Sequence, residues 1–305
     1  ISPGVVELPW DFSGEFTRED LPALGNLPRH RVRGQGLIMP PETVKLNRRD
    51  SLAVITVDRP EARNALTPAM ISALGQAIES CQPRDVRAVL ITGTNGAFCS
   101  GADVNDLLGH QEAGGGEDLS RHLRELAGEL HQRVILGIRR LEKPVVAAVN
   151  GVAAGAGFSL ALACDLRLAS HNSRFLMAYA NIGATADGGS TWLLPRLVGM
   201  GRAMEIYTAS QPMSAEYARE LGLVNQVIPA ANFEHHSLEI ATRLAQGPTI
   251  AFGRVKALFD RSWETTLESQ LDAETDAITR IALTNDFQEG IKAFTQKRQP
   301  WFQGS

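Results

Sequence analysis

The chain has 305 residues, of which 44% are apolar and 21% are charged, and its formal net charge is −4. This length allows one large domain with an appendage or two modest domains, and it can bury a sizeable core. The composition is ordinary for a soluble enzyme, and the slight negative charge gives no general attraction to nucleic acid or anionic membranes. Any phosphate group must therefore be bound by a local site.

The cysteine pattern indicates free thiols. Cys81, Cys99 and Cys164 are widely separated, form no C-x-x-C pair and have no histidine at a zinc-ligand spacing. Such a pattern suits a reducing compartment, so we expect a cytoplasmic protein without metal ligands. No apolar run approaches the ~20 residues of a membrane span, because the densest stretch, 144–163, is interrupted by polar residues and glycines.

The first part of the chain differs from the rest. Residues 1–44 contain six of the fifteen prolines and show little periodicity, which predicts an irregular arm that packs on the protein or embraces a neighbouring subunit. Residues 52–58 then predict a buried strand that ends at Arg59-Pro60. A helix follows, because Thr67 suits an N-cap, Pro68 suits the first helical position and apolar residues recur at helical spacing.

Further strands and helices alternate along the chain. Residues 87–92 and 144–150 each predict a strand followed by a glycine, and this alternation indicates an α/β core with βαβ crossovers. The Gly-rich stretch 112–117 predicts a flexible loop tip, either a mobile lid or a tolerated surface loop. After a strand-like stretch at 223–228, helical patterns continue to Phe302, so the end of the chain should form a helical appendage.

Two segments present small residues between a strand and a helix. In residues 96–103, small side chains let backbone amides approach a ligand, and free amides at a helix start suit an oxygen that gains negative charge. The alternative is an ordinary strand-to-helix turn. Residues 150–160 repeat this arrangement but contain neither G-x-G-x-x-G nor Gly-Lys-Ser/Thr, so they match no nucleotide-binding motif. They could complete a site with two amide donors.

A third segment, residues 183–196, places Asp187 among small residues before an apolar run. Aspartate is a preferred N-cap, and Gly188 and Gly189 could simply serve the turn. Taken by itself, this segment favours a helix cap.

In their order, these segments resemble the crotonase (enoyl-CoA hydratase/isomerase) superfamily, from about residue 45 to the end. The resemblance is carried by five stretches, namely 58–66, which looks like a loop that contacts coenzyme A, the oxyanion segments 98–103 and 150–160, the helix-strand unit 214–224 and the closing helix 289–298.

The resemblance implies a spiral of ββα units over residues 45–240 and a helical trimerisation region over residues 241–305. Trimers in this superfamily are often paired into hexamers. Its members bind an acyl-coenzyme A thioester, so coenzyme A enters with the substrate and no separate cofactor is expected. We expect no nucleic-acid or membrane partner.

The resemblance also assigns site residues. It implies that the N–H groups of Ala102 and Ala156 bind the thioester oxygen, with Ala156 standing where the family often has glycine. The basic side chain of Lys297 could reach a coenzyme A phosphate from a neighbouring subunit, or simply be solvated. The remaining residues expected to contact substrate are Ala62, Ser100, Gly101, Asp103, Gly155, Ser159, Tyr179 and Trp192.

The expected reaction depends on three positions. Hydratases of the superfamily use two glutamates, and the matching positions hold Ser159 and Tyr179, neither of which can act as a carboxylate base on water. The sequence is closest to the phenylacetate-pathway enoyl-CoA and ring-epoxide isomerase branch, in which the residue matching Asp187 is the acid/base. The chain departs from that branch at Thr185 and Ala186, where an apolar residue and proline are favoured, which affects the expected pitch of the loop.

Other functions remain open at this point. They are hydration by an unusual set of residues, thioester hydrolysis, C–C bond cleavage, and a noncatalytic member that binds coenzyme A or RNA. Cys99 is interpreted as a packing residue because no base is placed beside it. No triad or metal-ligand pattern is recognised among the histidines, which are interpreted as surface or structural residues, namely His110, His122, His131, His171, His235 and His236.

Overall fold

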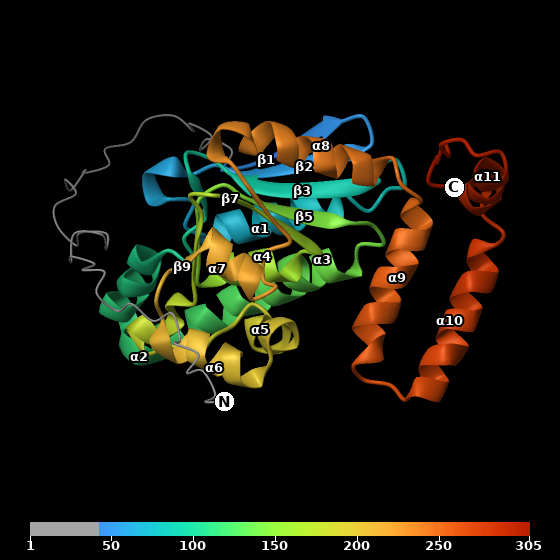
Figure 1. The fold of residues 1–305 in the computed structure, drawn as a ribbon. Helices are drawn as coiled ribbons and strands as arrows, with labels where there is room; N and C mark the ends of the chain where they lie inside the picture. The colour runs from blue at the N-terminus through green and yellow to red at the C-terminus, as the bar shows by residue number, and fades with distance from the viewer. Residues whose placement is uncertain (1–42) are drawn as a thin grey trace, which may run out of the picture. The chain divides into compact units, whose positions relative to one another are not determined.

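A six-stranded, mainly parallel sheet organises the computed structural model, which describes residues 43–305 (Figure 1). The predicted arm, residues 1–44, lies outside the described residues except for its last two. The edge strand β1 is antiparallel to β2, and the other neighbours are parallel. In spatial order the strands are β1 (Val44–Arg49), β2 (Leu52–Val57), β3 (Ala88–Gly93), β5 (Val145–Val149), β7 (Leu166–Ser170) and β10 (Gln226–Ile228).

A second sheet of short strands lies beside the first. Three times, a strand of the large sheet is followed by one of the small sheet and then by helical structure, which is the repeated ββα unit of the crotonase spiral. The predicted fold class is therefore confirmed. The short strands are β4 (Ala97–Cys99), β6 (Val152–Ala154), β8 (Arg174–Leu176) and β9 (Met213–Ser214).

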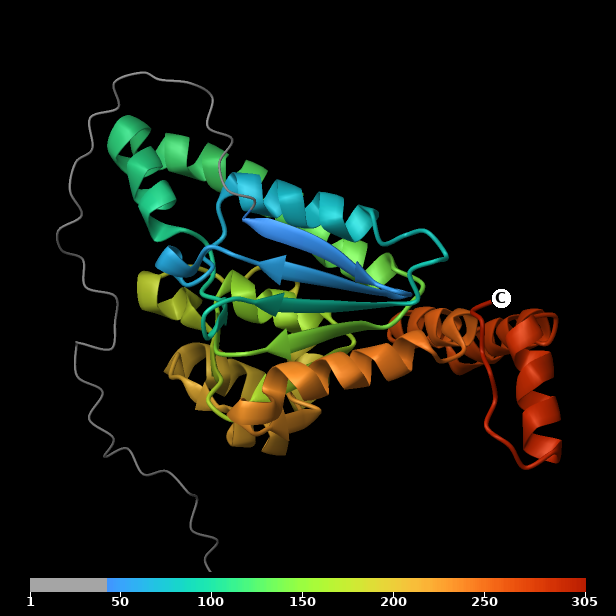
Figure 2. The same cartoon turned by 90° about the horizontal axis from the view of Figure 1, so that it is seen from above.

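Helices cover both faces of the large sheet (Figures 1 and 2). Side chains alternate along a strand, so neighbouring residues face opposite layers. Ala53, Ile55 and Val57 of β2 join the larger buried cluster with α1 (Pro68–Glu79) and α4 (Ala156–Ala163). The opposite face packs on α8 (Phe233–Ala245), as Leu52 does.

The predicted first helix is confirmed. The Thr67 hydroxyl accepts a hydrogen bond from Met70 N–H at 3.3 Å, and Pro68 opens α1. Other elements of the core are the short helices η2 (Pro60–Ala62), η4 (Ala178–Ile182) and η5 (Ala230–Asn232), with α3 (Leu136–Arg140), α5 (Ser190–Val198), α6 (Met200–Ala209) and α7 (Ala215–Glu220).

The prediction of a loop tip at residues 112–117 is wrong. These residues lie inside α2 (Val104–Glu129), which continues into the π-helical segment η3 (Leu130–Ile135). The helix breaks at Gly115, where φ is 68° and ψ is −160°. Only glycine adopts this conformation readily, so the glycine run produces a sharp bend between two helical halves instead of a loop.

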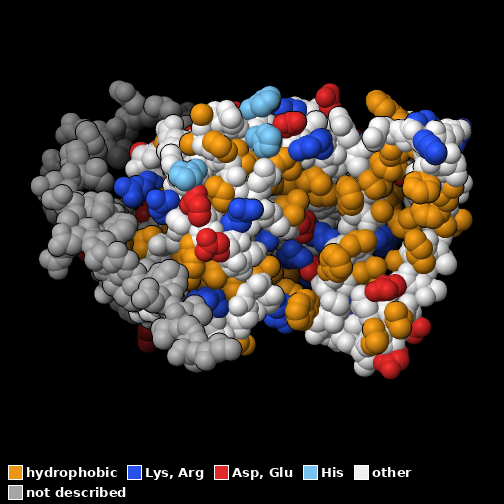
Figure 3. Space-filling view, viewed as in Figure 1, with side chains coloured by type: hydrophobic (Ala, Val, Ile, Leu, Met, Phe, Trp, Pro, Cys, Tyr) orange, Lys and Arg blue, Asp and Glu red, His pale blue; other side chains and the backbone are white. Residues whose placement is uncertain are grey.

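The C-terminal region is helical, as expected. The boundary expected at residue 240 falls inside α8, which packs on the sheet, so the appended helices begin after it. They are α9 (Thr249–Ser262), α10 (Leu267–Ile281) and α11 (Asn285–Thr295). Apolar side chains gather on this part of the surface in Figure 3, and among residues 43–305 no helix is long and apolar enough to cross a membrane.

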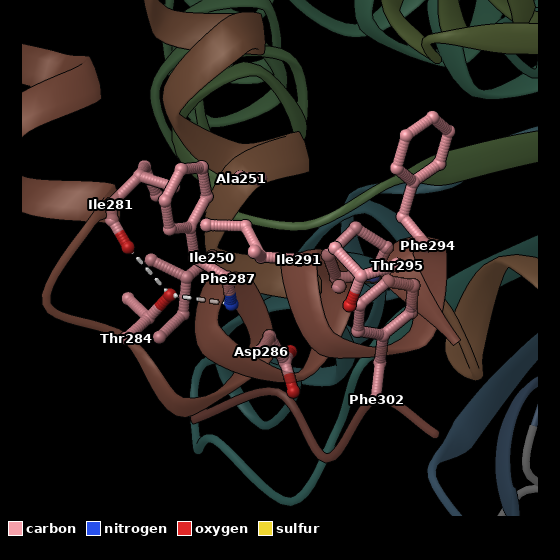
Figure 4. Close-up of a pocket in the computed structure, with 12 residues that line it drawn as sticks. Ile250, Ala251, Ile281, Thr284, Asp286, Phe287, Ile291, Phe294, Thr295 and Phe302 are labelled. Atoms are coloured by element: carbon pink, nitrogen blue, oxygen red, sulfur yellow. Dashed lines mark hydrogen bonds between the residues drawn. The ribbon is translucent and has the colours of Figure 1, made fainter. Parts of the chain in front are cut away.

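An apolar cavity of about 380 Å³ lies among α9, the end of α10, α11 and the C-terminal tail (Figure 4). The Thr284 hydroxyl caps α11 by accepting from Phe287 N–H at 3.2 Å and donates to Ile281 O at 2.7 Å. Phe302 folds back towards Gly290 of α11. This cavity is therefore built by the helical appendage and not by the segments that carry the predicted chemistry.

Candidate active site

The first segment of small residues forms the turn between β4 and α2. Ala102 makes a parallel bridge with Leu66, in which Leu66 N–H donates to Gly101 O at 2.7 Å and Asp103 N–H donates to Leu66 O at 3.0 Å. The groups that bond to Leu66 are Gly101 O and Asp103 N–H, on either side of Ala102. Successive N–H groups of an extended segment point to opposite sides, so the Ala102 N–H points away from Leu66. That amide can therefore meet an external oxygen.

The second segment forms the turn between β6 and α4. Gly155 has φ 50° and ψ −123°, a conformation that favours glycine, and Ala156 directly follows as the first residue of α4. The first N–H groups of a helix have no intrahelical acceptor. A Cβ at Gly157 would lie 2.1 Å from Cys99 O, so glycine at this position lets α4 begin directly against β4.

The two turns contact each other. A Cβ built on Gly101 would lie 3.5 Å from Ala156 N and 3.0 Å from Ala154 O. The amides of Ala102 and Ala156 thus belong to adjacent backbone segments, as two donors must if they are to share one oxygen that gains charge.

Asp187 lies in the loop between η4 and α5, and its side chain does not cap a helix. The N-cap of α5 is Gly189, with no side-chain capping bond, so the cap interpretation of Asp187 is wrong. Its Oδ1 instead accepts a hydrogen bond from the Tyr179 hydroxyl at 2.5 Å. The Asp187 side chain is 35% exposed, so a bound molecule could reach it.

Ser159 and Tyr179 connect this loop to α4. Ser159 is fully buried, and its hydroxyl oxygen lies 3.0 Å from the Tyr179 hydroxyl and 2.9 Å from Asp187 O. Burial, followed by the charge of Asp187, raises the pKa of Tyr179, so its hydroxyl stays protonated and acts as a donor. Since Ser159 and Ala156 share α4, these contacts tie the carboxylate to the second amide.

His131 also faces Asp187, which the sequence interpretation missed. The Gly188 N–H donates to His131 Nε2 at 3.0 Å, so this nitrogen acts as an acceptor. The same Nε2 lies 3.9 Å from Asp187 Oδ2. No local motif marks His131, because it reaches the site from η3, far from Asp187 in the sequence.

Backbone contacts fix the loop that carries Asp187. The Tyr207 hydroxyl donates to Ala184 O at 2.9 Å, and the Ser190 hydroxyl donates to Asp187 O at 2.7 Å. These bonds hold the loop on both sides of Thr185 and Ala186, the positions that depart from the isomerase pattern.

The loop expected to contact coenzyme A lies against the first amide turn. The Ser100 hydroxyl donates to Ala62 O at 3.2 Å. Asp103 is nearly buried, with Oδ1 accepting from Asn105 N–H at 2.9 Å and Oδ2 paired with Arg59 at 2.6 Å. Both carboxylate oxygens of Asp103 are therefore engaged within the protein, which favours a role in positioning the turn.

Trp192 and Lys297, both expected to contact substrate, lie on α5 and just beyond α11. The Arg196 guanidinium stacks 3.8 Å from the centre of the Trp192 ring, and Trp192 lines a separate cavity of about 730 Å³ between α5 and α9. These contacts give no support to Trp192 as a residue of the acyl site. Lys297 is exposed just beyond α11, a helix far from α5 in Figure 1.

Cys99 packs in the core, as expected. It is fully buried, and burial raises the pKa of its thiol to about 12. A thiol that stays protonated at neutral pH is a poor nucleophile.

Comparisons with known proteins agree with this geometry. A relative from Rhodobacter capsulatus named "probable enoyl-CoA hydratase" is 40% identical over 86% of this chain and 98% of its own. The 1,2-epoxyphenylacetyl-CoA isomerase of Escherichia coli is 36% identical over 82% of this chain and 94% of its own. The crystal structure of an enoyl-CoA hydratase from Bacillus anthracis superposes with a TM-score of 0.79 at 30% identity, covering 87% of this chain and all of that one.

The sequence model of the enoyl-CoA hydratase/isomerase family matches residues 47–305, which include every segment described above. The ββα spiral, the two adjacent amide turns and this match lead to one assignment. The chain belongs to the enoyl-CoA hydratase/isomerase family, within the crotonase superfamily.

Proposed function

We propose that this enzyme shifts the double bond of an enoyl-coenzyme A thioester, with Asp187 as the acid/base and the amides of Ala102 and Ala156 as oxyanion donors. The observation that carries this proposal is the hydrogen bond from Tyr179 to Asp187 Oδ1. It holds one carboxylate oxygen in place, while Oδ2 lies 3.9 Å from His131 Nε2 in a side chain that is 35% exposed. A fixed carboxylate with one available oxygen suits a group that takes a proton and returns it.

The proposed reaction conserves all atoms. Asp187 takes a proton from C2 of a 3-enoyl thioester, and the electron pair of the C–H bond moves into the conjugated system to form a dienolate. The negative oxygen of the dienolate accepts hydrogen bonds from Ala102 N–H and Ala156 N–H. Asp187 then returns the proton at C4, which leaves the 2-enoyl thioester. A single oxyanion donor typically lowers such a barrier by ~3 kcal/mol.

The residues at the hydratase positions support isomerisation over hydration. Ser159 and Tyr179 stand where hydratases of the superfamily carry glutamates, and their hydroxyls lie 3.0 Å apart. The Tyr179 hydroxyl donates to Asp187 and stays protonated, so it cannot accept a proton from water. Among Ser159, Tyr179 and Asp187, only Asp187 has a carboxylate that can act as the base.

The test is a comparison of two Asp-to-Asn variants. We expect Asp187→Asn to bind coenzyme A thioesters with unchanged affinity and to lose isomerase turnover, measured with a panel of 2-enoyl and 3-enoyl thioesters. The matched control is Asp50→Asn, in an exposed turn between β1 and β2 where asparagine tolerates the positive φ. Full turnover by Asp187→Asn would refute the assignment.

Hydration is the second candidate, because one relative 40% identical to this chain is named a probable enoyl-CoA hydratase. Mass spectrometry in H₂¹⁸O separates the two reactions. Incorporation of ¹⁸O at C3 of a 2-enoyl thioester would identify a hydratase, whereas double-bond migration without ¹⁸O supports the isomerase. Release of free coenzyme A or of a shortened acyl chain would instead indicate hydrolysis or C–C cleavage.

We also propose that the chain forms a homotrimer, alone or as a pair of trimers, through its helical appendage. Large apolar side chains are exposed there, including Leu283 and Phe294, each 86% exposed, and Ile278 of α10. Exposed apolar surface of this kind marks an interaction site. Sedimentation equilibrium should give a trimer or hexamer for the wild type and for Leu46→Asp on β1, outside the appendage, but smaller species for Ile278→Asp. A monomeric wild type would contradict the proposal.

A further inference from the structure

The bent helix α2 carries a side-chain cluster that the proposed reaction does not use. Asp106 and His110 lie four residues apart before the bend, and Asp118 and His122 lie four residues apart after it. Residues at this spacing share one face of a helix. The bend at Gly115 turns the two Asp-His pairs towards each other.

Each carboxylate contacts the histidine of the other helical half. Asp106 Oδ2 lies 2.6 Å from His122 Nε2, and Asp118 Oδ2 lies 2.7 Å from His110 Nδ1. The two imidazole rings stack, with centres 3.7 Å apart and planes inclined by 16°. The sequence showed no ligand pattern among the histidines and therefore did not predict this cluster.

We propose that Asp106, His110 and His122 form a binding site for a divalent transition-metal cation of the zinc class. One ligand atom from each residue lies within 4.8 Å of the others. Ligands in a tetrahedral zinc site lie about 3.3 Å apart, given bonds of about 2.0–2.1 Å. The ligand atoms therefore need to approach by up to about 1.5 Å, and the two stacked imidazole rings need to turn so that the metal lies in the plane of each ring. A water molecule can supply the fourth ligand.

The chemistry of the donors favours zinc over magnesium or calcium. Imidazole nitrogen is a preferred ligand of zinc, copper and nickel, whereas magnesium and calcium prefer an all-oxygen environment. The contact with Asp118 occupies His110 Nδ1 and leaves Nε2 free for the metal. A carboxylate that holds the second nitrogen of a ligating histidine is a common feature of metal sites.

Asp118 is suited to that supporting role. Its Oδ2 lies 2.7 Å from His110 Nδ1, and its Oδ1 is paired with Arg121. Asp118 can then fix the orientation of the His110 ring. We expect Asp118 to act as a positioning residue and not as a ligand.

Metal binding would replace the direct contact between Asp106 Oδ2 and His122 Nε2, which lie 2.6 Å apart. The metal would join the two halves of α2 across Gly115. Since Asp103 caps α2 immediately after Ala102, this junction would stiffen the helix that follows the first amide turn.

Isothermal titration calorimetry of the full chain with ZnCl₂ tests the site directly and requires no activity assay. We expect one zinc ion per chain, with an affinity reduced more than tenfold in His122→Gln and in His110→Gln. Asp118→Asn should lose about 10–100-fold, the usual effect of removing a residue that supports a metal ligand. The matched control, His236→Gln, alters a half-exposed histidine on α8 and should bind as the wild type does.

Two further measurements keep the result interpretable. Circular dichroism of each variant without metal checks that the fold is intact, and a second titration with MgCl₂ measures the selectivity for zinc. Zinc binding that persists in both His110→Gln and His122→Gln, or equal binding of Mg²⁺, would overturn the proposal. Because the isomerase assay is not used, failure here leaves the proposed function untouched.

Discussion

The Tyr179 hydroxyl donates to Asp187 Oδ1 at 2.5 Å, so it can hold the carboxylate that we propose as the acid/base. Tyr179→Phe removes the donor and keeps the ring. Hydrogen bonds to charged groups contribute about 1.5–3 kcal/mol, so we expect isomerase kcat to fall about 10–100-fold. Steady-state kinetics with 3-enoyl thioesters measures this. An unchanged kcat would show that the hydroxyl does not help to hold the carboxylate.

His131 should act by holding the loop through Gly188. In His131→Leu the Gly188 N–H loses its acceptor at 3.0 Å, and the loop that carries Asp187 loosens. We expect kcat to fall about tenfold, because an unsatisfied buried donor costs about 1–3 kcal/mol. His131→Gln should recover part of the activity, since its amide oxygen can accept the same bond. If Gln and Leu were equally impaired, the acceptor role would be wrong.

Strongly periodic elements of the fold could be predicted from the sequence. The strands near residues 52–58, 87–92 and 144–150 are apolar runs, and α1 carries a cap, a proline and a helical apolar face. The three-residue strands β4, β6 and β8 escaped prediction because so few residues give no periodic signal. The strand β1 is mostly exposed and polar, so its sequence lacks the alternating apolar residues from which a strand could be predicted.

Candidate site residues could be named from the sequence only where they belong to ordered motifs. The roles of Ala102, Ala156 and Asp187 come from the family resemblance that three ordered small-residue segments carry, and they stay predictions. His131 and the His110–His122 pair depend on tertiary contacts, because histidines that meet across a bend or between distant elements leave no local pattern. The sequence also could not specify that the Arg196 guanidinium stacks on the Trp192 ring, and a contact of Trp192 with substrate stays a prediction.

At the start of α4, we expect Ala156→Gly to be tolerated and Gly157→Ala to destabilise the fold. Ala156→Gly keeps the backbone N–H, so isomerase activity should stay within about threefold, because glycine near a helix end costs at most about 0.5–1 kcal/mol. Gly157→Ala places a methyl group 2.1 Å from Cys99 O and must displace α4 from β4. Such overpacking typically costs about 1–3 kcal/mol, which should appear in the free energy of unfolding and in lost activity. Equal stability of the two variants would contradict the close approach.

The expected contact between Lys297 and a coenzyme A phosphate can be tested by mutation. Lys297 is exposed beyond α11, so Lys297→Ala should leave the fold intact. We expect the KM for a coenzyme A thioester to rise about tenfold, the effect of losing one charged hydrogen bond, with kcat unchanged. The matching pantetheine thioester lacks the nucleotide phosphates, so its KM should not change. An equal rise in KM for both substrates would exclude a phosphate contact.

Glu289 should anchor the C-terminal tail in a pH-dependent manner. Arg298 donates to both oxygens of Glu289, at 2.6 and 2.8 Å, and Trp301 N–H donates to Oε1 at 2.8 Å. The Arg298 bond, followed by that from Trp301, lowers the pKa of Glu289 from its ordinary 4.5 to about 2. A carboxyl with a lowered pKa stabilises the folded state fully above its ordinary value and loses this contribution as the pH falls towards the lowered one.

Hydrogen exchange at the Trp301 amide measures this anchoring. Protection should be constant above about pH 4.5 and decline towards about pH 2, since protonation of Glu289 removes the charged acceptor. In Glu289→Gln the protection should be low even at neutral pH, whereas Glu264→Gln, an exposed glutamate between α9 and α10, should behave as the wild type. If the Glu289→Gln amide stayed protected, the tail would be held mainly by Phe302 against α11 and by the bonds of Asp286 to Gln303 and Gly304 N–H.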